Sequence, residues 1–152
     1  MNIREEIVRI GGRLEGEYFI GLKEPGTVST GYVNMDPAFT YPRLLERFGV
    51  NLVEPFEWRF NAFAAPAIGG IPIIYTALQS IKGKELRAAW ADKLPDGSFA
   101  FMRMGFTEAV RGRDVLVLED VTTTGNSSRA VGKLVLAAGG NVIGYSCVWN
   151  RG

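Results

Sequence analysis

The stretch Asp114-Val115-Leu116-Val117-Leu118-Glu119-Asp120-Val121-Thr122-Thr123-Thr124-Gly125-Asn126-Ser127 decides the fold of this chain. Its four consecutive branched apolar residues are typical of a strand that is buried on both faces of a parallel sheet. Two carboxylates follow where this strand is expected to end, and a hydroxyl-rich loop with one glycine comes next. Ser127 and Ser128 are suited to cap a helix over residues 129–138. We therefore predict a strand–loop–helix unit of an α/β domain.

The adjacent acids Glu119 and Asp120 lie where parallel sheets bind ligands, at the carboxyl end of a strand. The next helix would present its free N–H groups and its positive dipole end beside them, which favours a phosphate. Carboxylates can hold a sugar diol, while amides and hydroxyls can hold the phosphate of the same sugar. A buried strand, a polar turn and an ordinary helix cap would explain much of the pattern, but not two acids followed by three threonines. The stretch therefore predicts a site for a phosphorylated ribose.

Two absences restrict the chemistry. The chain has no Gly-rich loop that ends in Lys-Ser or Lys-Thr, which excludes the phosphate-binding loop of a nucleotide hydrolase. It also contains no histidine, which excludes serine–histidine triads, histidine bases and histidine-ligated metals. Any acid–base or metal chemistry must use carboxylates, hydroxyls, lysines and arginines.

The composition indicates one domain over residues 1–152, without a charged surface for nucleic acid or membrane. Lys and Arg number 17 against 16 Asp and Glu, and no run of like charge exceeds two residues. Residues 62–78 are uncharged, but two prolines and two glycines argue against a membrane span. The lone Cys147 is expected to pack as a small hydrophobe. With no apolar signal segment near Met1, we expect a cytoplasmic protein.

A small N-terminal unit is predicted before the sheet. Apolar residues recur at helical spacing at Ile3, Ile7, Ile10 and Leu14. They predict an amphipathic helix that ends near Gly16. Residues 18–22 and 28–33 then suit a hairpin around Glu24-Pro25-Gly26. Residues 1–34, called the hood below, could cover the ligand site, although the same pattern suits plain packing.

The remaining elements alternate between helix and strand. We expect helices over residues 41–53 and 71–79, with Thr40 as the cap of the first, and strands over residues 60–65, 86–90, 99–102 and 141–149. Residues 92–98 form a polar turn, and Arg151 follows the last strand. This alternation predicts an α/β domain with right-handed crossovers and a core sheet within residues 60–152.

A second glycine-containing loop, Pro66-Ala67-Ile68-Gly69-Gly70, follows a strand and precedes a helix. Its glycines would let the backbone approach an anion, although tight turns also need glycine. Two anion-binding loops on one sheet suit a substrate that carries both a phosphate and a diphosphate. From pattern alone, Lys93 and Arg103 are as compatible with solvated loop charge as with a role in the site.

The segment from Leu118 to Ser127 resembles the phosphoribosyl-pyrophosphate motif of the type I phosphoribosyltransferases. Within that family the chain is most similar to the orotate phosphoribosyltransferases, on residues 16–34, on residues 65–70 and on Trp149-Asn150-Arg151. The resemblance implies a parallel-sheet, Rossmann-like core with a helix and hairpin hood. It also implies a homodimer with shared active sites.

The same resemblance implies roles for individual residues. Glu119 and Asp120 would hold the ribose hydroxyls, and Lys93 and Asp120 would be catalytic. Orotate would contact Thr123 and, through its carboxylate, Arg151. Mg²⁺ would bind through the substrate, with no direct protein ligand. The residues implied to bind phosphoribosyl pyrophosphate are Ala67, Ile68, Gly69, Gly70, Lys93, Arg103, Glu119, Asp120, Val121, Thr122, Thr123, Thr124, Gly125, Asn126 and Ser127.

The implied reaction joins orotate to phosphoribosyl pyrophosphate and yields orotidine 5-monophosphate and diphosphate. The chain departs from the family at Thr27-Val28-Ser29, where a basic residue and a histidine commonly precede the serine, and at residues 92–98, which are usually more basic. Two alternatives stay open: a phosphoribosyltransferase for a purine or another base, and a non-catalytic regulator that binds phosphoribosyl pyrophosphate. Arg151 distinguishes orotate from the first alternative, because a purine has no carboxylate to pair with this residue.

Overall fold

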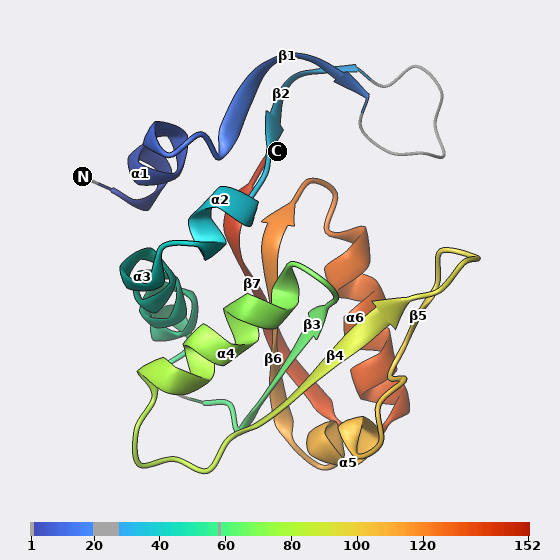
Figure 1. The fold of residues 1–152 in the computed structure, drawn as a ribbon. Helices are drawn as coiled ribbons and strands as arrows, with labels where there is room; N and C mark the ends of the chain where they lie inside the picture. Colours follow the sequence, from blue (N-terminus) through green and yellow to red (C-terminus); the bar gives the residue numbers. More distant parts are fainter. Residues whose placement is uncertain (1, 20–27, 58) are drawn as a thin grey trace.

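A five-stranded sheet with helices on both faces forms the body of the molecule (Figure 1). The structure is a computed structural model that describes residues 2–19, 28–57 and 59–152. The strand order is β5-β4-β3-β6-β7. The strands are β3 (Ala62–Pro66), β4 (Arg87–Lys93), β5 (Phe99–Ala100), β6 (Asp114–Thr122) and β7 (Asn141–Asn150), all parallel except β5, which is antiparallel to β4. The predicted α/β class is confirmed.

Alternating residues of the central strands face two different layers. Leu116 and Leu118 of β6 pack with α4 (Gly70–Ser80) and α3 (Pro42–Val53). Val115 and Val117 face the opposite way, toward α5 (Phe106–Val110) and α6 (Asn126–Ala137). All four side chains are fully buried, as the unbroken apolar run predicts for a strand covered on both faces. This alternation decides where the acids that follow must point.

The direction in which strands are added to the sheet reverses between β3 and β6. From β3 the chain moves to β4 on one side, and later to β6 and β7 on the other side. In open parallel sheets the ligand crevice lies at the carboxyl ends of the strands where the order reverses. Two loops meet at this point, residues 67–69 after β3 and residues 123–125 after β6.

The hood contains a helix and a hairpin, with different limits from those predicted. Helix α1 (Ile3–Arg9) is shorter than expected, and Leu14 lies in strand β1 (Arg13–Phe19). The helix cannot continue because Gly11 has a φ of 81°, a left-handed conformation that terminates helices. Strand β2 (Val28–Val33) pairs with β1 in antiparallel fashion, which confirms a hairpin, whereas the predicted turn at Glu24-Pro25-Gly26 lies outside the described residues.

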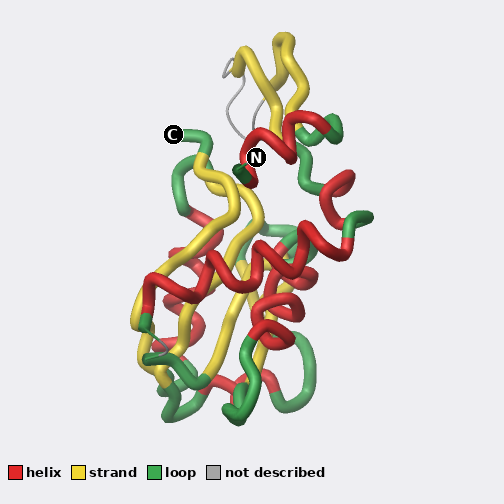
Figure 2. The backbone as a smooth tube through the Cα atoms, turned by 90° about the vertical axis from the view of Figure 1, so that its left-hand side faces the viewer, coloured by secondary structure: helices red, strands yellow, loops and turns green. Residues whose placement is uncertain are grey.

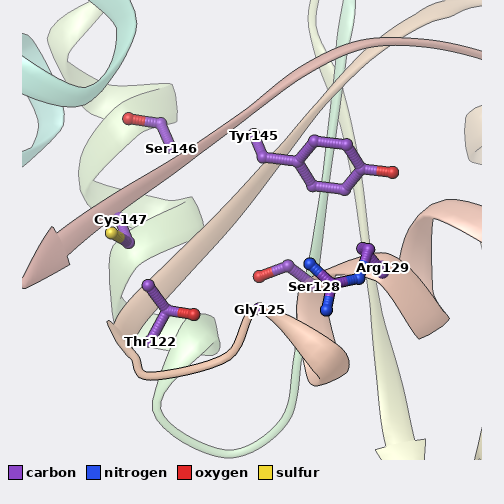
Figure 3. Close-up of a pocket in the computed structure, with 7 residues that line it drawn as sticks. All are labelled: Thr122, Gly125, Ser128, Arg129, Tyr145, Ser146 and Cys147. Carbon is purple, nitrogen blue, oxygen red and sulfur yellow. The ribbon is translucent and has the colours of Figure 1, made fainter. Parts of the chain in front are cut away.

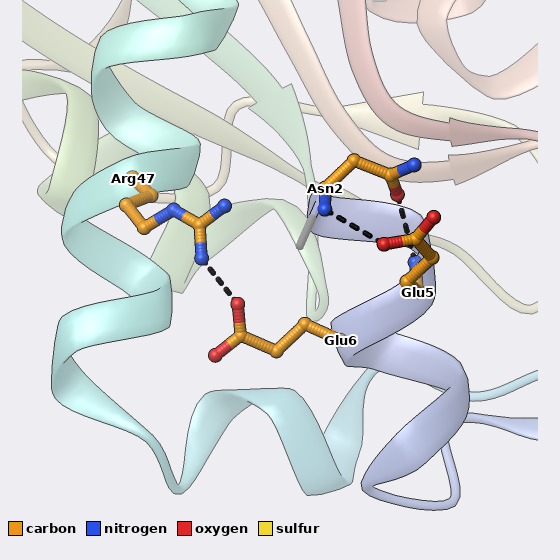
Figure 4. Close-up of polar contacts among 4 residues, drawn as sticks. All are labelled: Asn2, Glu5, Glu6 and Arg47. Carbon is orange, nitrogen blue, oxygen red and sulfur yellow. Dashed lines mark hydrogen bonds and ion pairs between the residues drawn. The ribbon is translucent and has the colours of Figure 1, made fainter.

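Polar contacts fix α1 at its start and against α3 (Figure 4). Asn2 and Glu5 form a capping box, in which each side chain accepts from the backbone N–H of the other. Glu6 forms an ion pair with Arg47 of α3. Figures 1 and 2 place the β1–β2 hairpin beyond the carboxyl ends of β6 and β7, the end of the sheet that carries the predicted site.

Several other boundaries differ from the predicted ones. Helix α3 begins after Tyr41 and has no side-chain cap, so Thr40 does not cap it. A short helix α2 (Asp36–Phe39) and a 3-10 turn (Glu54–Phe56) carry no clear sequence signal. Strand β4 runs on to Lys93, two residues into the predicted turn. Among the described residues, no helix combines the length and the apolar character needed to span a membrane.

Candidate active site

Glu119 lies on the α6 side of the sheet because it continues the alternation of Val115 and Val117. Its side chain is buried, at 7% exposure, and the hydroxyl of Ser128 in α6 donates a hydrogen bond to Glu119 Oε2. Burial raises the pKa of Glu119 above its ordinary value, and the charge of Asp120 adds to this rise while the bond from Ser128 opposes it. An acid in such a position is an unusual choice for stability alone.

Asp120 points to the opposite side of the sheet from Glu119 and lies against the loop of residues 67–69. A Cβ atom built on Gly69 would lie 2.1 Å from Asp120 Oδ2, so the carboxylate occupies the space that any other residue at position 69 would need. Burial raises the pKa of Asp120, the backbone N–H groups of Val121 and Asp120 itself lower it, and the charge of Asp36 raises it further. The glycine loop after β3 therefore meets the end of β6 through Gly69 and Asp120.

The loop after β6 turns sharply into α6. Gly125 has a φ of 73° and stands at the N-cap position without a side-chain cap, so the predicted capping by Ser127 and Ser128 is wrong. Both serines lie inside the first turn, because the helix begins at Asn126. The side chains of Thr123, Thr124 and Asn126 are exposed at this helix N-terminus, the arrangement that binds phosphate groups.

Arg129 holds this loop together, a role that the sequence pattern did not predict. Its Nη2 atom donates to the carbonyl oxygen of Thr124 at 2.7 Å and to Asn126 Oδ1 at 2.8 Å. A Cβ on Gly125 would lie 3.0 Å from Arg129 Nη1, so the guanidinium packs closely over the glycine. A basic residue one turn into a helix that follows a phosphate loop is the sequence signal that could have identified it.

A cavity of about 300 Å³ lies behind the loop, between α6 and β7 (Figure 3). Its lining residues are Thr122, Gly125, Ser128, Arg129, Tyr145, Ser146 and Cys147. Thr122 Oγ1 is buried, and the Thr122 hydroxyl weakly lowers the pKa of Glu119. Cys147 is only partly buried and lines this cavity, and burial followed by the charge of Glu119 raises the pKa of its thiol.

The loop after β3 leads into the N-terminus of α4. Ala67 N donates to the carbonyl oxygen of Ala91 at 2.8 Å, and Ile71 N donates to that of Ile68 at 3.0 Å. The Ala67–Ile68 peptide bond is cis, and the Ile68 side chain is 82% exposed. Gly70 packs so closely on β3 that a Cβ there would lie 2.6 Å from the Cβ of Ala65. The loop therefore brings backbone, rather than bulky side chains, up to Asp120.

Lys93 and Arg103 belong to the β4–β5 hairpin and its exit, which projects from the body of the molecule (Figure 1). Lys93 is exposed and pairs with Phe99 across the hairpin, whose turn is closed by a bond from Leu94 N to Ser98 O of 2.8 Å. Arg103 Nε lies 3.8 Å from Asp92 Oδ2. Within the described residues, no hydrogen bond or ion pair joins Lys93 or Arg103 to the two acids or the phosphate loop.

Arg151 connects the hood to the site. Its backbone N–H donates to Thr122 O at 2.8 Å, which places Arg151 beside the loop of residues 123–125, called the phosphate loop below. Its Nη2 donates to Gly31 O at 2.9 Å, and its guanidinium carbon lies 5.5 Å from the centroid of the Tyr32 ring. In the part of the chain that the structure describes, no group of three or more Cys, Asp and Glu side chains is arranged to hold a metal ion.

Comparisons with known proteins agree with this geometry. No protein-family model matches the chain. The chain is 34% identical over 153 residues to the orotate phosphoribosyltransferase of Caldanaerobacter subterraneus subsp. tengcongensis, in an alignment that covers 97% of this chain and 76% of that relative. It is similar in structure to a phosphoribosyltransferase from Corynebacterium diphtheriae, with a TM-score of 0.77, 25% identity and coverage of 98% of this chain and 81% of that chain.

A further similar structure was solved with phosphoribosyl pyrophosphate bound. It is the orotate phosphoribosyltransferase of Mycobacterium tuberculosis in complex with that ligand, with a TM-score of 0.63, 26% identity and coverage of 78% of this chain and 67% of that chain. Fold, motif and full-length similarity agree, and the chain belongs to the orotate phosphoribosyltransferase family of the type I phosphoribosyltransferases.

Proposed function

We propose that the protein transfers the phosphoribosyl group of phosphoribosyl pyrophosphate to orotate, and forms orotidine 5-monophosphate and diphosphate. The observation that carries the proposal is the position of two adjacent acids, Glu119 and Asp120, between the N-terminus of α6 and the glycine loop before α4. The full-length similarity to orotate phosphoribosyltransferases supports the choice of reaction.

The two acids and the two loops have separate roles in this proposal. Glu119 and Asp120 accept hydrogen bonds from the ribose hydroxyls and hold the sugar in one orientation. The loop of Thr123, Thr124 and Asn126 binds the 5-phosphate at the helix N-terminus. Backbone groups of residues 67–70 contact the diphosphate, since the glycines allow a close approach. Positioning of this kind removes much of the entropic barrier to the reaction.

In the chemical step the bond from the anomeric carbon to the diphosphate oxygen breaks, and its electron pair leaves with the diphosphate. A bond from orotate nitrogen to that carbon forms, and the proton of this nitrogen passes to water or to the departing diphosphate. Positive charge develops on the sugar while negative charge grows on the diphosphate. We assign Mg²⁺ to the substrate oxygens rather than to a protein cage, as Mg²⁺ commonly binds substrate phosphates. Bound to substrate oxygens, Mg²⁺ would supply part of the neutralising charge.

Lys93 and Arg103 are the cations that we assign to the departing diphosphate. Lys93 stands on a projecting hairpin, and within the described residues it forms no hydrogen bond or ion pair with Glu119 or Asp120 of its own chain. A homodimer in which Lys93 reaches the neighbour's diphosphate therefore suits the hairpin better than action within one chain. Arg103 would have to exchange its 3.8 Å ion pair with Asp92 for the diphosphate.

Arg151 and Thr123 are assigned to orotate. A guanidinium can pair with the carboxylate in bidentate geometry, and Arg151 already stands at the carboxyl end of β7, beside the phosphate loop. Its partners are the carbonyl oxygen of Gly31 and the ring of Tyr32, and a carboxylate would be a stronger acceptor than this neutral carbonyl.

A second candidate, a non-catalytic protein that binds phosphoribosyl pyrophosphate, is favoured by one observation. The β4–β5 hairpin carries Asp92 and Asp96, and Arg103 is paired with Asp92, so acids offset the cations that the leaving group needs. Such a protein would bind the ligand with Mg²⁺ but would release no diphosphate.

The deciding experiment measures diphosphate release with orotate, uracil, adenine and hypoxanthine, next to a thermal-shift titration with phosphoribosyl pyrophosphate and Mg²⁺. Free ligand at about a hundred times its dissociation constant should stabilise the fold by about 2.7 kcal/mol. Turnover restricted to orotate supports the proposal, and a thermal shift without turnover supports the regulator. A folded sample that shows neither would exclude both. Asp120→Asn, which keeps shape and removes charge, is the matched control for ligand binding.

A further inference from the structure

The first turn of α6 contacts both halves of the proposed ribose phosphate site. Ser128 is the third residue of the helix and is 7% exposed. It points to the sheet, and its hydroxyl donates to Glu119 Oε2, which is equally buried. Arg129, the next residue, points outward and holds Thr124 and Asn126. One helical turn therefore fixes the acid and the phosphate loop relative to each other.

The bond from Ser128 affects both the direction and the charge of Glu119. A buried carboxylate without a donor would rotate or take up a proton, because burial disfavours its ionised form. A hydroxyl donor stabilises the ionised form and restricts the rotation of the carboxylate. The ionised form of Glu119 has two acceptor oxygens and no donor, so it is the form best suited to accept hydrogen bonds from two ribose hydroxyls at once.

We propose that Ser128 is a positioning residue for the reaction, which holds Glu119 in the orientation and charge state that accept the ribose hydroxyls. The inference rests on the proposed function, since it assumes that Glu119 binds the ribose. In this proposal Ser128 acts through Glu119 and not by contacting the substrate itself. It sets the carboxylate at a fixed place relative to the phosphate loop, so that the sugar and its 5-phosphate are held at the same time.

A pH profile separates this role from a purely structural one. The groups that act on the charge of Glu119 are the hydroxyl of Ser128 on α6, Asp120 on the same strand and, more weakly, the hydroxyl of Thr122 at the end of that strand. The thiol of Cys147 on β7 also faces this acid, and Arg129 lies at the outer surface of α6. Asp120 disfavours the ionised form and Ser128 favours it. Loss of the Ser128 hydroxyl therefore raises the pKa of Glu119 further, and moves the acid limb of ligand binding to higher pH. A general loss of stability would not move that limb.

The first arm of the test needs no ligand. The carboxyl group of Glu119 is titrated by NMR in isotope-labelled wild type, Ser128→Ala and Ser128→Thr, with Glu119→Gln to assign its signal. We expect a higher midpoint in Ser128→Ala and a return toward wild type in Ser128→Thr, which restores the hydroxyl. If the added methyl group prevents folding, Ser128→Cys, with a weak donor of similar size, should give an intermediate midpoint. An unchanged midpoint in Ser128→Ala overturns the inference.

The second arm measures the binding of phosphoribosyl pyrophosphate with Mg²⁺ from about pH 8 to about pH 5. Ser128→Ala should bind roughly tenfold more weakly at neutral pH, the effect of about one lost hydrogen bond to a charged group, and its acid limb should lie at higher pH. Ser80→Ala is the matched control, because Ser80 donates to Ala77 O at 2.8 Å in α4, away from the acids. Ser80→Ala should follow the wild-type profile.

The two arms distinguish the inference from the function on which it rests. Wild type that does not bind the ligand refutes the proposed function, while the NMR titration still reports whether Ser128 controls Glu119. Wild type that binds, together with a Ser128→Ala profile of wild-type shape, refutes the positioning role alone.

Discussion

At the scale of single residues, the site depends on two acids that are neighbours in sequence but not in environment. Because strand residues alternate, Glu119 is directed to α6 and Asp120 to the loop before α4. Glu119 is buried against Ser128, while the half-buried Asp120 lies against Gly69. In the proposed site, the two acids would therefore contact the ribose from two sides of the strand.

The contact between Gly69 and Asp120 leads to a first prediction. Gly69→Ala places a Cβ atom where Asp120 Oδ2 now lies, 2.1 Å away, and a short side chain can escape only by rotation. We expect a folded protein with little change in melting temperature, but at least about tenfold weaker binding of phosphoribosyl pyrophosphate, since a hydrogen bond to a charged group is lost. Calorimetric titration measures the binding. Asp120→Asn should reproduce the loss without the steric change, and wild-type affinity in Gly69→Ala would contradict the assigned role of Asp120.

The raised pKa values of both acids predict how stability depends on pH. A carboxyl group whose folded pKa is raised above the unfolded value binds protons more tightly in the native state. Its ionisation therefore lowers the unfolding free energy, a loss that is absent below the unfolded pKa and complete above the folded pKa. Asp120→Asn should raise the melting temperature of the ligand-free protein at neutral pH by a few degrees. The gain should disappear in acid, and thermal scans that show the same gain at every pH would refute this explanation.

At the scale of elements, the proposed phosphate site is formed by β6, the loop that follows it and α6. The strand supplies the acids, the helix supplies its N-terminus, and Gly125 makes the turn between them possible through its positive φ. Arg129 adds a cation whose hydrogen bonds go to the loop itself. If the loop binds phosphate as proposed, this preorganisation would lower the entropic cost of binding.

We therefore predict that Arg129→Ala weakens the binding of ribose 5-phosphate by about fivefold or more, the effect of roughly one net hydrogen bond of loop preorganisation. Arg113→Ala is a suitable control, because Arg113 also donates to backbone carbonyls, but at the opposite end of β6. Titration calorimetry of the two variants gives the comparison. Equal affinities would show that Arg129 is not needed to shape the loop.

At the scale of the whole molecule, the hood is connected to the sheet through Arg151. The side chain reaches Gly31 O and the Tyr32 ring of the hairpin, while its backbone contacts Thr122. The proposed base site therefore lies between two parts of the chain that are more than a hundred residues apart in sequence, as the separation of Gly31 and Arg151 shows.

This arrangement predicts selective turnover. The protein should use orotate and make little use of uracil, which lacks the carboxylate. Arg151→Ala should reduce orotate turnover far more than it reduces binding of phosphoribosyl pyrophosphate, and Arg151→Lys should not restore it fully, because a lysine cannot form the bidentate pair. Steady-state kinetics with both bases tests this. Comparable rates with uracil, or a preference for adenine, would assign the protein to another base.

The projecting β4–β5 hairpin predicts a site shared between subunits. Lys93→Ala and Asp120→Asn should each be nearly inactive alone. If Lys93 serves the neighbour, a mixture that exchanges subunits contains hybrid dimers with one intact site each, and activity should return to about a quarter of wild type for random pairing. Mass spectrometry confirms the exchange. A mixture that stays inactive would show that Lys93 acts within its own chain or has no catalytic role.

The sequence by itself determined the local units of this protein. The apolar run before Glu119, the glycines of residues 67–70 and the alternation of helix and strand predicted the α/β class, the two loops and the family motif. These features are visible because strand burial, tight turns and helix starts depend on neighbouring residues. Two helix ends were predicted wrongly because a nearby glycine with positive φ was overlooked. Gly11 ends α1 before Leu14, and Gly125 takes the cap position expected for Ser127 and Ser128.

Only the tertiary structure decided which distant groups meet. The strand order β5-β4-β3-β6-β7 brings Gly69 against Asp120, and the packing of α6 on β6 brings Ser128 to Glu119. It also turns Arg151 toward the hood and Arg103 toward Asp92. No periodicity encodes these pairs, because they result from how two layers pack across a sheet, and a side chain's partner there depends on the position of the whole opposing element.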